Sequence, residues 1–281
     1  MLSYRHAFHA GNHADVLKHF VLTQVLKYFI QKDKPFWYID THAGAGMYEL
    51  DEGYAVQNAE FRDGIERLWQ DPELHPALKE YVALVRGSNP PGKLKYYPGS
   101  PGFARPLLRA DDQMCLFELH PTDYELLCQG FERKGKKIQI AQKDGFAGLK
   151  AVLPPPPRRA VVLIDPPYEQ KQDYAKVVDV LKESVHRFAT GTYILWYPLL
   201  QRPEPRLLQE RLQKLELPSW LHVTLSVQSP SKEGFGMFGS GLFVINPPWT
   251  LKQTLEETMP ILVEQLGLDR GAHYTLDAVI P

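Results

Sequence analysis

The run Asp165-Pro166-Pro167-Tyr168 carries the sharpest chemical signal in the sequence. It directly follows Val161-Val162-Leu163-Ile164, an apolar stretch with the form of a buried strand. A carboxylate, a proline carbonyl whose direction the following ring restricts, and an aromatic face together suit an exocyclic amino group on a flat heterocycle. A rigid strand exit without chemistry is the plain alternative. The position favours a site, because ligands of open α/β sheets bind at the carboxyl ends of the strands.

Three more apolar runs end in or near an acidic residue. Asp40 follows residues 36–39, Glu118 follows residues 114–117, and Asp144 comes shortly after residues 138–140. Glu118 is placed to accept hydrogen bonds from ribose hydroxyls, and Asp144 from an adenine amino group. Each acid alone could equally be a solvated strand end or a helix cap. Four acids at four successive strand ends favour one shared ligand site.

The glycines after the first strand limit which cofactor could bind there. Gly44 and Gly46 form a Gly-x-Gly turn, which allows a ligand to approach the backbone closely. The dinucleotide fingerprint would need glycine at position 49, where the chain has Glu49, and the sequence contains no Walker-type phosphate loop. The loop is therefore better suited to a cofactor without phosphates.

The elements that must position these residues alternate between strand and helix, which predicts a doubly wound, mostly parallel sheet. The last two strands lack an intervening helix and should form an antiparallel hairpin at one edge. The seven predicted strands are residues 36–39, 114–117, 138–140, 160–164, 193–196, 223–227 and 242–245. The predicted helices are residues 15–30, capped by Asn12, and residues 122–131, 145–153, 174–188 and 205–215.

One interval breaks this rhythm. Asp40 and Glu118 lie much farther apart than the roughly 20 residues that a plain βαβ unit needs. Residues 58–70 and 76–85 both have amphipathic helical patterns. We therefore predict one domain over residues 1–281 with an inserted helical subdomain at residues 51–96.

The composition describes an ordinary globular protein. Of 281 residues, 44% are hydrophobic and 23% charged, which excludes a mainly disordered or collagen-like chain. The first residues lack the apolar core of a signal peptide, no stretch is long and apolar enough to cross a bilayer, and Cys115 and Cys128 form no metal-spaced cluster. We expect a cytoplasmic protein with no membrane partner.

The formal net charge of −1 means that any nucleic-acid binding must come from local basic patches. One basic turn could supply such a patch, although a solvated loop is the default interpretation. The turn consists of Arg133, Lys134, Lys136 and Lys137, and the residues that could add to it are Arg105, Arg109, Arg158 and Arg159.

Two further patterns have a plain and a functional interpretation. His6, His9, His13 and His19 crowd the N-terminus, but no acidic partner set completes a metal site, so a polar lid without metal is preferred. Asn246-Pro247-Pro248-Trp249 has the same chemical form as the run at Asp165. Because its strand should lie at a sheet edge, we assign it structure or a wall of the substrate cleft.

Taken together, these motifs resemble a known enzyme family. The order Asp40-x-x-x-Gly44-x-Gly46, Glu118, Asp144 and Asp165-Pro166-Pro167-Tyr168 is similar to S-adenosylmethionine-dependent methyltransferases of adenine N6. The chain resembles more closely, and nearly end to end, the RlmJ family, which methylates an adenine of 23S ribosomal RNA. That closer resemblance also rests on Met1-Leu2-Ser3-Tyr4-Arg5-His6, His9 to His19, Tyr97-Pro98-Gly99-Ser100-Pro101, Glu118-Leu119-His120-Pro121, Asp144-Gly145-Phe146 and Leu195-Trp196-Tyr197-Pro198.

The resemblance implies a Rossmann-like class I methyltransferase fold, S-adenosyl-L-methionine as cofactor and 23S ribosomal RNA as partner. We further expect a monomer without a metal. In that family, Tyr4 matches a residue that contacts the RNA, and the catalytic position matches Asp165. The cofactor is held by residues that match His19, His42, Ser100, Glu118, Asp144 and Gly145. Lys18 is a further candidate, for the methionine carboxylate of the cofactor.

The expected chemistry is positional. Asp165 and the Pro166 carbonyl would hold the two N–H groups of the amine so that its lone pair faces the methyl group, and Tyr168 would stack on the base. Two alternatives remain open from sequence: a DNA adenine-N6 methyltransferase with the same site, and a nucleic-acid-binding protein with a degenerate cofactor pocket. The intact run at Asp165 argues against the second.

Overall fold

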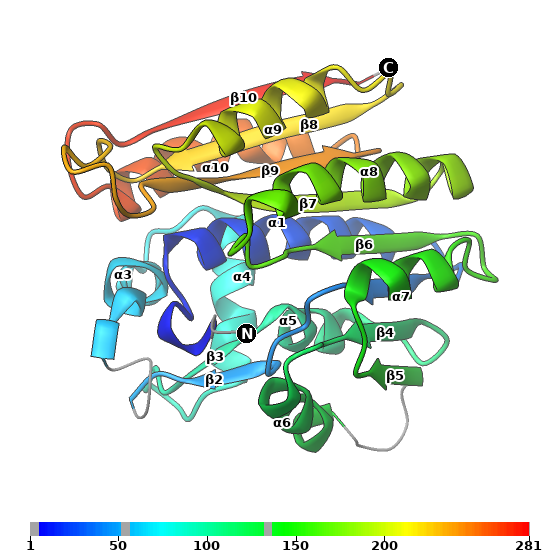
Figure 1. The fold of residues 1–281 in the computed structure, drawn as a ribbon. Helices are drawn as coiled ribbons and strands as arrows, with labels where there is room; N and C mark the ends of the chain where they lie inside the picture. Colours follow the sequence, from blue (N-terminus) through cyan, green and yellow to red (C-terminus); the bar gives the residue numbers. More distant parts are fainter. Residues whose placement is uncertain (1–5, 52–56, 132–136, 281) are drawn as a thin grey trace.

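The computed structural model describes residues 6–51, 57–131 and 137–280 (Figure 1). Its strands are β1 Trp37–Asp40, β2 Met47–Glu49, β3 Tyr96–Pro98, β4 Gln113–Phe117, β5 Lys137–Ala141, β6 Ala160–Ile164, β7 Thr192–Leu199, β8 Trp220–Ser226, β9 Gly239–Ile245 and β10 His273–Val279. Its α-helices are α1 His13–Phe29, α3 Ile65–Gln70, α4 Pro76–Gly87, α5 Ser100–Leu107, α6 Pro121–Phe131, α7 Gly145–Val152, α8 Lys171–Arg187, α9 Pro203–Gln213 and α10 Leu251–Leu266. Two short 3-10 helices are η1 His6–Phe8 and η2 Glu60–Asp63.

The main sheet confirms the predicted α/β class and adds a strand. It has eight strands in the order β10-β8-β9-β7-β6-β1-β4-β5, and the five strands from β7 to β5 are mutually parallel. β8 and β9 pair antiparallel, as predicted, but β10 pairs with β8 and forms the edge. The prediction of seven strands with the hairpin at the edge was therefore wrong by one strand.

Helices cover both faces of the sheet, as Figure 1 shows. Alternate residues of each strand point to opposite faces, so Tyr38 and Leu163 join the hydrophobic cluster under α1, α4, α5 and α10. Ile39 and Val162 join the cluster under α7, α8 and α9. This burial on both faces explains why the central parallel strands are continuous apolar runs in the sequence.

α1 is an unusually buried helix. Asn12 caps it as predicted, since the side-chain oxygen accepts the backbone N–H groups of Ala14 and Asp15. Of its 17 residues, all except His13, Gln24, Lys27 and Tyr28 are buried. α1 contacts β6, β7 and β9 in the middle of the sheet and also α4, α5 and α10. Its polar residues are therefore placed inside the protein rather than in solvent.

The predicted insertion packs on α1 rather than forming a core of its own. Its apolar side chains on α3 and α4, including Ile65 and Tyr81, belong to the cluster that contains Phe20 of α1. The predicted helix at residues 58–70 is broken at Gly64, whose backbone (φ −122°, ψ −115°) is not helical. Glycine allows the chain to lie close to Gly11, since a Cβ there would lie 2.0 Å from the Gly11 carbonyl oxygen. The close approach lets the Ile65 N–H donate to that carbonyl at 2.8 Å.

The run Asn246-Pro247-Pro248-Trp249 lies at the end of the sheet where the parallel strands start, whereas Asp165 lies at their carboxyl ends. Because β9 is antiparallel to β7, the end of β9 lies beside the start of β7, with Ile245 paired to Tyr193. The Asn246 side-chain amide donates to the carbonyls of Ala189 and Gly191. The structural interpretation is confirmed, and both the edge position and the cleft wall were wrong.

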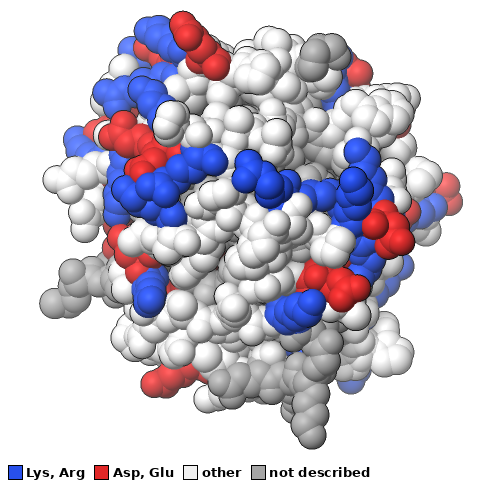
Figure 2. All heavy atoms as spheres, turned by 90° about the vertical axis from the view of Figure 1, so that its right-hand side faces the viewer, with Lys and Arg blue, Asp and Glu red and all other residues white. Residues whose placement is uncertain are grey.

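The arginines at the start of the parallel strands are committed to local structure. Arg109 donates to Asp112 and to the carbonyls of Lys32 and Lys34, and Arg159 donates to the carbonyls of Phe29 and Lys34. The parallel strands run toward the left in Figure 1, so they start on the right-hand side of that view. Figure 2 looks onto this side and shows Lys and Arg side chains gathered on it. Arg133, Lys134 and Lys136 lie outside the described residues.

Within the described ranges, no helix has the length and apolar character to cross a bilayer.

Candidate active site

A cavity of about 220 Å³ lies at the carboxyl ends of the parallel strands. The structure brings most of the predicted site residues together around it, from α1 and from the ends of four strands. The predicted residues that line it are Lys18, His19, His42, Ser100, Glu118, Asp144, Gly145, Asp165 and Pro166. Tyr4 lies outside the described residues.

Asp165 is held by a lysine from α1. The Lys18 ammonium lies 2.6 Å from one Asp165 carboxylate oxygen and 2.9 Å from Asp15. Burial alone would lower the pKa of Lys18, but the two carboxylates outweigh it and raise that pKa above its usual value. Lys18 therefore stays cationic at the site, with a hydrogen bond to Asp165 and an ion pair with Asp15.

Tyr168 differs from its predicted place. Its ring is 4% exposed and is not among the residues lining the cavity. The hydroxyl donates to the carbonyl of Trp196, and the ring packs 4.5 Å from that of Tyr174. Tyr168 has φ 51°, so the chain turns sharply there and directs the side chain into the interior. In this conformation Trp196, rather than Tyr168, presents an aromatic ring to the cavity.

Glu118 joins two loops at the cavity. Its carboxylate accepts the backbone N–H of Gly44 at 2.8 Å and that of His120 at 2.7 Å. Burial raises the pKa of Glu118, although these two amides act in the opposite direction. Each carboxylate oxygen has further acceptor capacity, so the side chain can also accept hydrogen bonds from a ligand.

Asp144 acts first as a helix cap. One oxygen accepts the N–H groups of Phe146 and Ala147 at the start of α7, and the other accepts from Lys176 at 3.0 Å. Burial would raise the pKa of Asp144, but Lys176 and the amides lower it. Gly145 is required beside it, because a Cβ there would lie 1.8 Å from the Thr41 carbonyl oxygen.

His42 presents a neutral ring to the cavity. Burial lowers the pKa of His42 to about 4, so the imidazole is uncharged near neutral pH. The ring packs edge-on to Phe146 at 5.1 Å, and its Nδ1 lies 2.8 Å from the Thr41 hydroxyl. A neutral ring in this position does not repel a positively charged ligand.

Asp40 does not line the cavity but holds two residues that do, Ser100 and His42. It is fully buried and accepts hydrogen bonds from the hydroxyls of Tyr38 and Ser100, each at 2.6 Å, and from the His42 N–H. Burial raises the pKa of Asp40. Of the four acids predicted at strand ends, Glu118, Asp144 and Asp165 therefore reach the cavity, and Asp40 orders two residues that do.

Two lining histidines carry a buried nitrogen without a partner among the described residues. They are the Nε2 of His19 and the Nδ1 of His120. The other nitrogen of His19 lies 2.8 Å from the Tyr97 hydroxyl, and its ring stacks on Phe103. Unpaired buried polar atoms are uncommon in folded proteins. Both nitrogens are therefore available to a ligand.

Sequence reasoning missed several lining residues, of which Trp196, His120 and Lys176 are examples. Trp196 could have been found, because it lies on β7, the strand next to β6, one residue beyond the partner of Ile164. Lys176 sits on α8, and nothing in its local sequence connects it to Asp144. Of the N-terminal histidines, His6 and His19 line the cavity, and His6 also contacts Asp15, whereas His9 contacts Glu60. The described residues contain no cluster suited to a metal ion.

Comparisons with known proteins agree along the whole chain. The family model described as "Ribosomal RNA large subunit methyltransferase D, RlmJ" matches residues 33–280. The ribosomal RNA large subunit methyltransferase J of Escherichia coli is 46% identical over 281 residues, and that of Haemophilus influenzae is 43% identical over 282, each covering 100% of both chains. A crystal structure of a Legionella pneumophila protein, 35% identical, has a TM-score of 0.89 and covers 96% of this chain and 98% of its own. The chain therefore belongs to the RlmJ family of large-subunit ribosomal RNA methyltransferases.

Proposed function

We propose that this methyltransferase transfers a methyl group from S-adenosylmethionine to the exocyclic N6 of an adenine in 23S ribosomal RNA. The observation that carries the proposal is the common cavity: Asp165 and Pro166 line it together with Glu118, His42 and Asp144. An amine-orienting carboxylate and a set of polar groups suited to a nucleoside cofactor thus open onto one space.

The residues present fit this cofactor. Glu118 would accept from the ribose hydroxyls while keeping its bonds to Gly44 and His120. The unpartnered nitrogens of His19 and His120 supply polar contacts at the cavity wall. When bound, S-adenosylmethionine supplies an electrophilic methyl group on a positively charged sulfur, and the neutral ring of His42 is compatible with that charge.

Asp144 would contribute differently from the sequence prediction. Its carboxylate is occupied by the α7 amides and by Lys176. We propose that it orders the loop and the Phe146 ring for the adenine end of the cofactor, with Gly145 allowing the loop to pack on Thr41. The remaining acceptor capacity of its oxygens could still reach an amino group.

Orientation of the target amine is the main task of the protein. The adenine N6 lone pair is conjugated with the ring, so the nitrogen must be held with its lone pair directed at the methyl group. Asp165 and the carbonyl of Pro166 would accept the two N–H groups and impose that geometry. Fixed acceptors of this kind can contribute several kcal/mol to the reaction. Lys18 keeps Asp165 in place through its 2.6 Å contact.

The RNA substrate must present the adenine out of its stack, because the cavity takes single groups and not a duplex. Trp196, which lies beside Lys18 with its ring centroid 5.6 Å from the ammonium, is an aromatic surface for the base. Contact between Tyr4 and the RNA, action as a monomer and a place in the cytoplasm remain parts of the proposal.

The test is incubation of the purified protein with isotope-labelled S-adenosylmethionine and unmodified 23S ribosomal RNA, followed by nucleoside mass spectrometry. A DNA duplex of matching sequence is the parallel substrate. We expect N6-methyladenosine in the RNA and no label in the DNA. Label confined to the DNA would favour a DNA adenine methyltransferase. Absence of cofactor binding in calorimetry would favour a binding protein with a degenerate pocket.

A further inference from the structure

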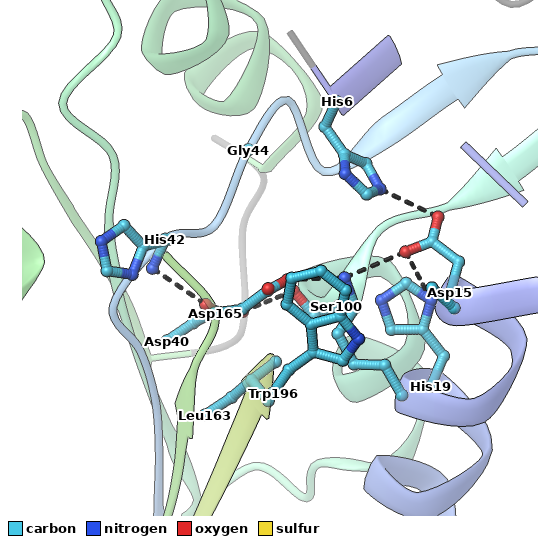
Figure 3. A network of polar contacts seen from close by, with 12 residues as sticks. His6, Asp15, His19, Asp40, His42, Gly44, Ser100, Leu163, Asp165 and Trp196 are labelled. Carbon is cyan, nitrogen blue, oxygen red and sulfur yellow. Dashed lines mark hydrogen bonds and ion pairs between the residues drawn. The ribbon is translucent and has the colours of Figure 1, made fainter. Parts of the chain in front are cut away.

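Asp15 is a buried acid beside the site that does not itself line the cavity. It lies in the first turn of α1 and is 1% exposed. One oxygen accepts the Gly11 N–H at 2.9 Å and contacts His6 at 2.8 Å. The other lies 2.9 Å from the Lys18 ammonium and 4.0 Å from His19. Figure 3 shows the rings of His6 and His19 on either side of the Asp15 carboxylate.

Lys18 thus bridges two carboxylates, with Asp15 on one side and Asp165 on the other. Burial would raise the pKa of Asp15, but His6, Lys18 and His19 hold it well below its usual range. The negative charge of Asp15 is therefore present under all ordinary conditions. With Lys18 only about 5% exposed, solvent cannot replace either carboxylate as its partner.

A purely structural role for Asp15 is the competing explanation. An acid in the first helical turn interacts favourably with the helix dipole, and the bond to Gly11 fixes the chain before α1. Neither role requires Lys18. The structural role predicts a loss of stability upon substitution, without a specific effect on the reacting groups.

We propose that Asp15 is a positioning residue, which anchors the Lys18 ammonium so that its 2.6 Å contact holds Asp165 in the orientation that accepts the substrate amine. This inference rests on the proposed function of Asp165. Without the charge of Asp15, the Lys18 ammonium is anchored on one side only, by Asp165. Lys18 and the Asp165 carboxylate can then turn together, and the carboxylate loses its fixed orientation toward the amine.

The test is a double-mutant cycle between Asp15→Asn and Lys18→Gln. Asparagine has nearly the same shape and retains an oxygen for the Gly11 N–H, so the local backbone keeps its partner. We expect Asp15→Asn to reduce the single-turnover rate by about 10- to 100-fold while the cofactor Kd changes by less than about 3-fold. In the Lys18→Gln background, Asp15→Asn should have almost no further effect on the rate, because the ammonium that Asp15 would anchor is absent.

Asp112→Asn is the matched control. Asp112 is also buried, accepts the backbone N–H groups of Phe36 and Arg109, and pairs with the Arg109 guanidinium, but it lies at the start of β4, away from the cavity. It should lower the melting temperature and leave the rate unchanged. A second readout, independent of activity, is the ¹⁵N-lysine spectrum: the Lys18 ammonium signal, identified by its loss in Lys18→Gln, should shift in Asp15→Asn and not in Asp112→Asn.

Each outcome is decisive. A wild-type protein that methylates no adenine overturns the proposed function itself. If the wild type is active but the two substitutions reduce the rate by independent factors, the role of Asp15 is overturned and the proposed function is not. An unmoved Lys18 signal in Asp15→Asn has the same meaning. If Asp15→Asn does not fold, Asp15→Glu keeps the charge but displaces it by one methylene group, and the same cycle and spectrum apply to it.

Discussion

Glu118 gives the most quantitative test of the cofactor site. Its carboxylate already accepts two backbone amides, from Gly44 and His120, and would accept the ribose hydroxyls with its remaining lone pairs. Glu118→Gln has nearly the same volume but replaces one acceptor oxygen by an NH2 group and removes the charge. Loss of one hydrogen bond to a charged acceptor, about 1.5–3 kcal/mol, corresponds to about a 10- to 150-fold weaker Kd.

The assay is calorimetric titration with S-adenosylhomocysteine and with its 2′-deoxy analogue. The wild type should lose affinity for the deoxy analogue, whereas Glu118→Gln should show little difference between the two ligands. Glu125→Gln, an exposed acid on α6, is the control and should bind as the wild type does. An unchanged Kd in Glu118→Gln, or an equal penalty for the deoxy analogue in both proteins, would refute the assignment.

Three further predictions concern the supporting residues. Gly145→Ala places a Cβ 1.8 Å from the Thr41 carbonyl oxygen, so it should cost about 1–3 kcal/mol in denaturant unfolding and weaken cofactor binding; a wild-type Kd would contradict this. Tyr168→Phe should lower stability by about 1 kcal/mol through the lost bond to Trp196 and leave the KM for RNA unchanged; a raised KM at unchanged stability would show that the hydroxyl acts on substrate. Burial lowers the pKa of His222 to about 4, so the folded protein binds fewer protons than the unfolded chain between that value and the usual one of about 6.5. Stability should therefore fall with decreasing pH across this window, by up to about 1.4 kcal/mol per pH unit, and His222→Gln should reduce the slope in urea unfolding; an equal slope in both would contradict the linkage.

The sequence predicted the parts of the site that depend on strand ends. Each central strand is buried on both faces and reads as an apolar run, so the polar residue after it can be placed at the carboxyl edge of the sheet. Glu118, Asp144 and Asp165 were found in this way, and all three line the cavity. The loop glycines and the helix cap at Asn12 are equally local signals.

Contacts between distant segments could not be predicted in this way. The Lys18–Asp165 pair joins α1 to the end of β6, and the Lys176–Asp144 pair joins α8 to the start of α7. Neither contact leaves a periodic or spacing signal. The break at Gly64 has the same origin, because it follows from the backbone of Gly11 approaching from another part of the chain.

The C-terminal elements were missed although a signal existed. β10 alternates strictly, with Tyr274, Leu276 and Ala278 packed against the core and the residues between them exposed. α10 buries Leu251, Leu255, Met259 and Leu262 at helical spacing despite the internal Pro260. Recognition of these patterns would have given eight strands and placed β8 and β9 inside the sheet.

The most direct measurement is single-turnover methyl transfer to 23S ribosomal RNA by Asp165→Ala, with cofactor affinity determined in parallel by calorimetry. If Asp165 orients the target amine, the variant should bind S-adenosylmethionine within severalfold of the wild type and form no detectable N6-methyladenosine. Transfer at the wild-type rate would contradict the account.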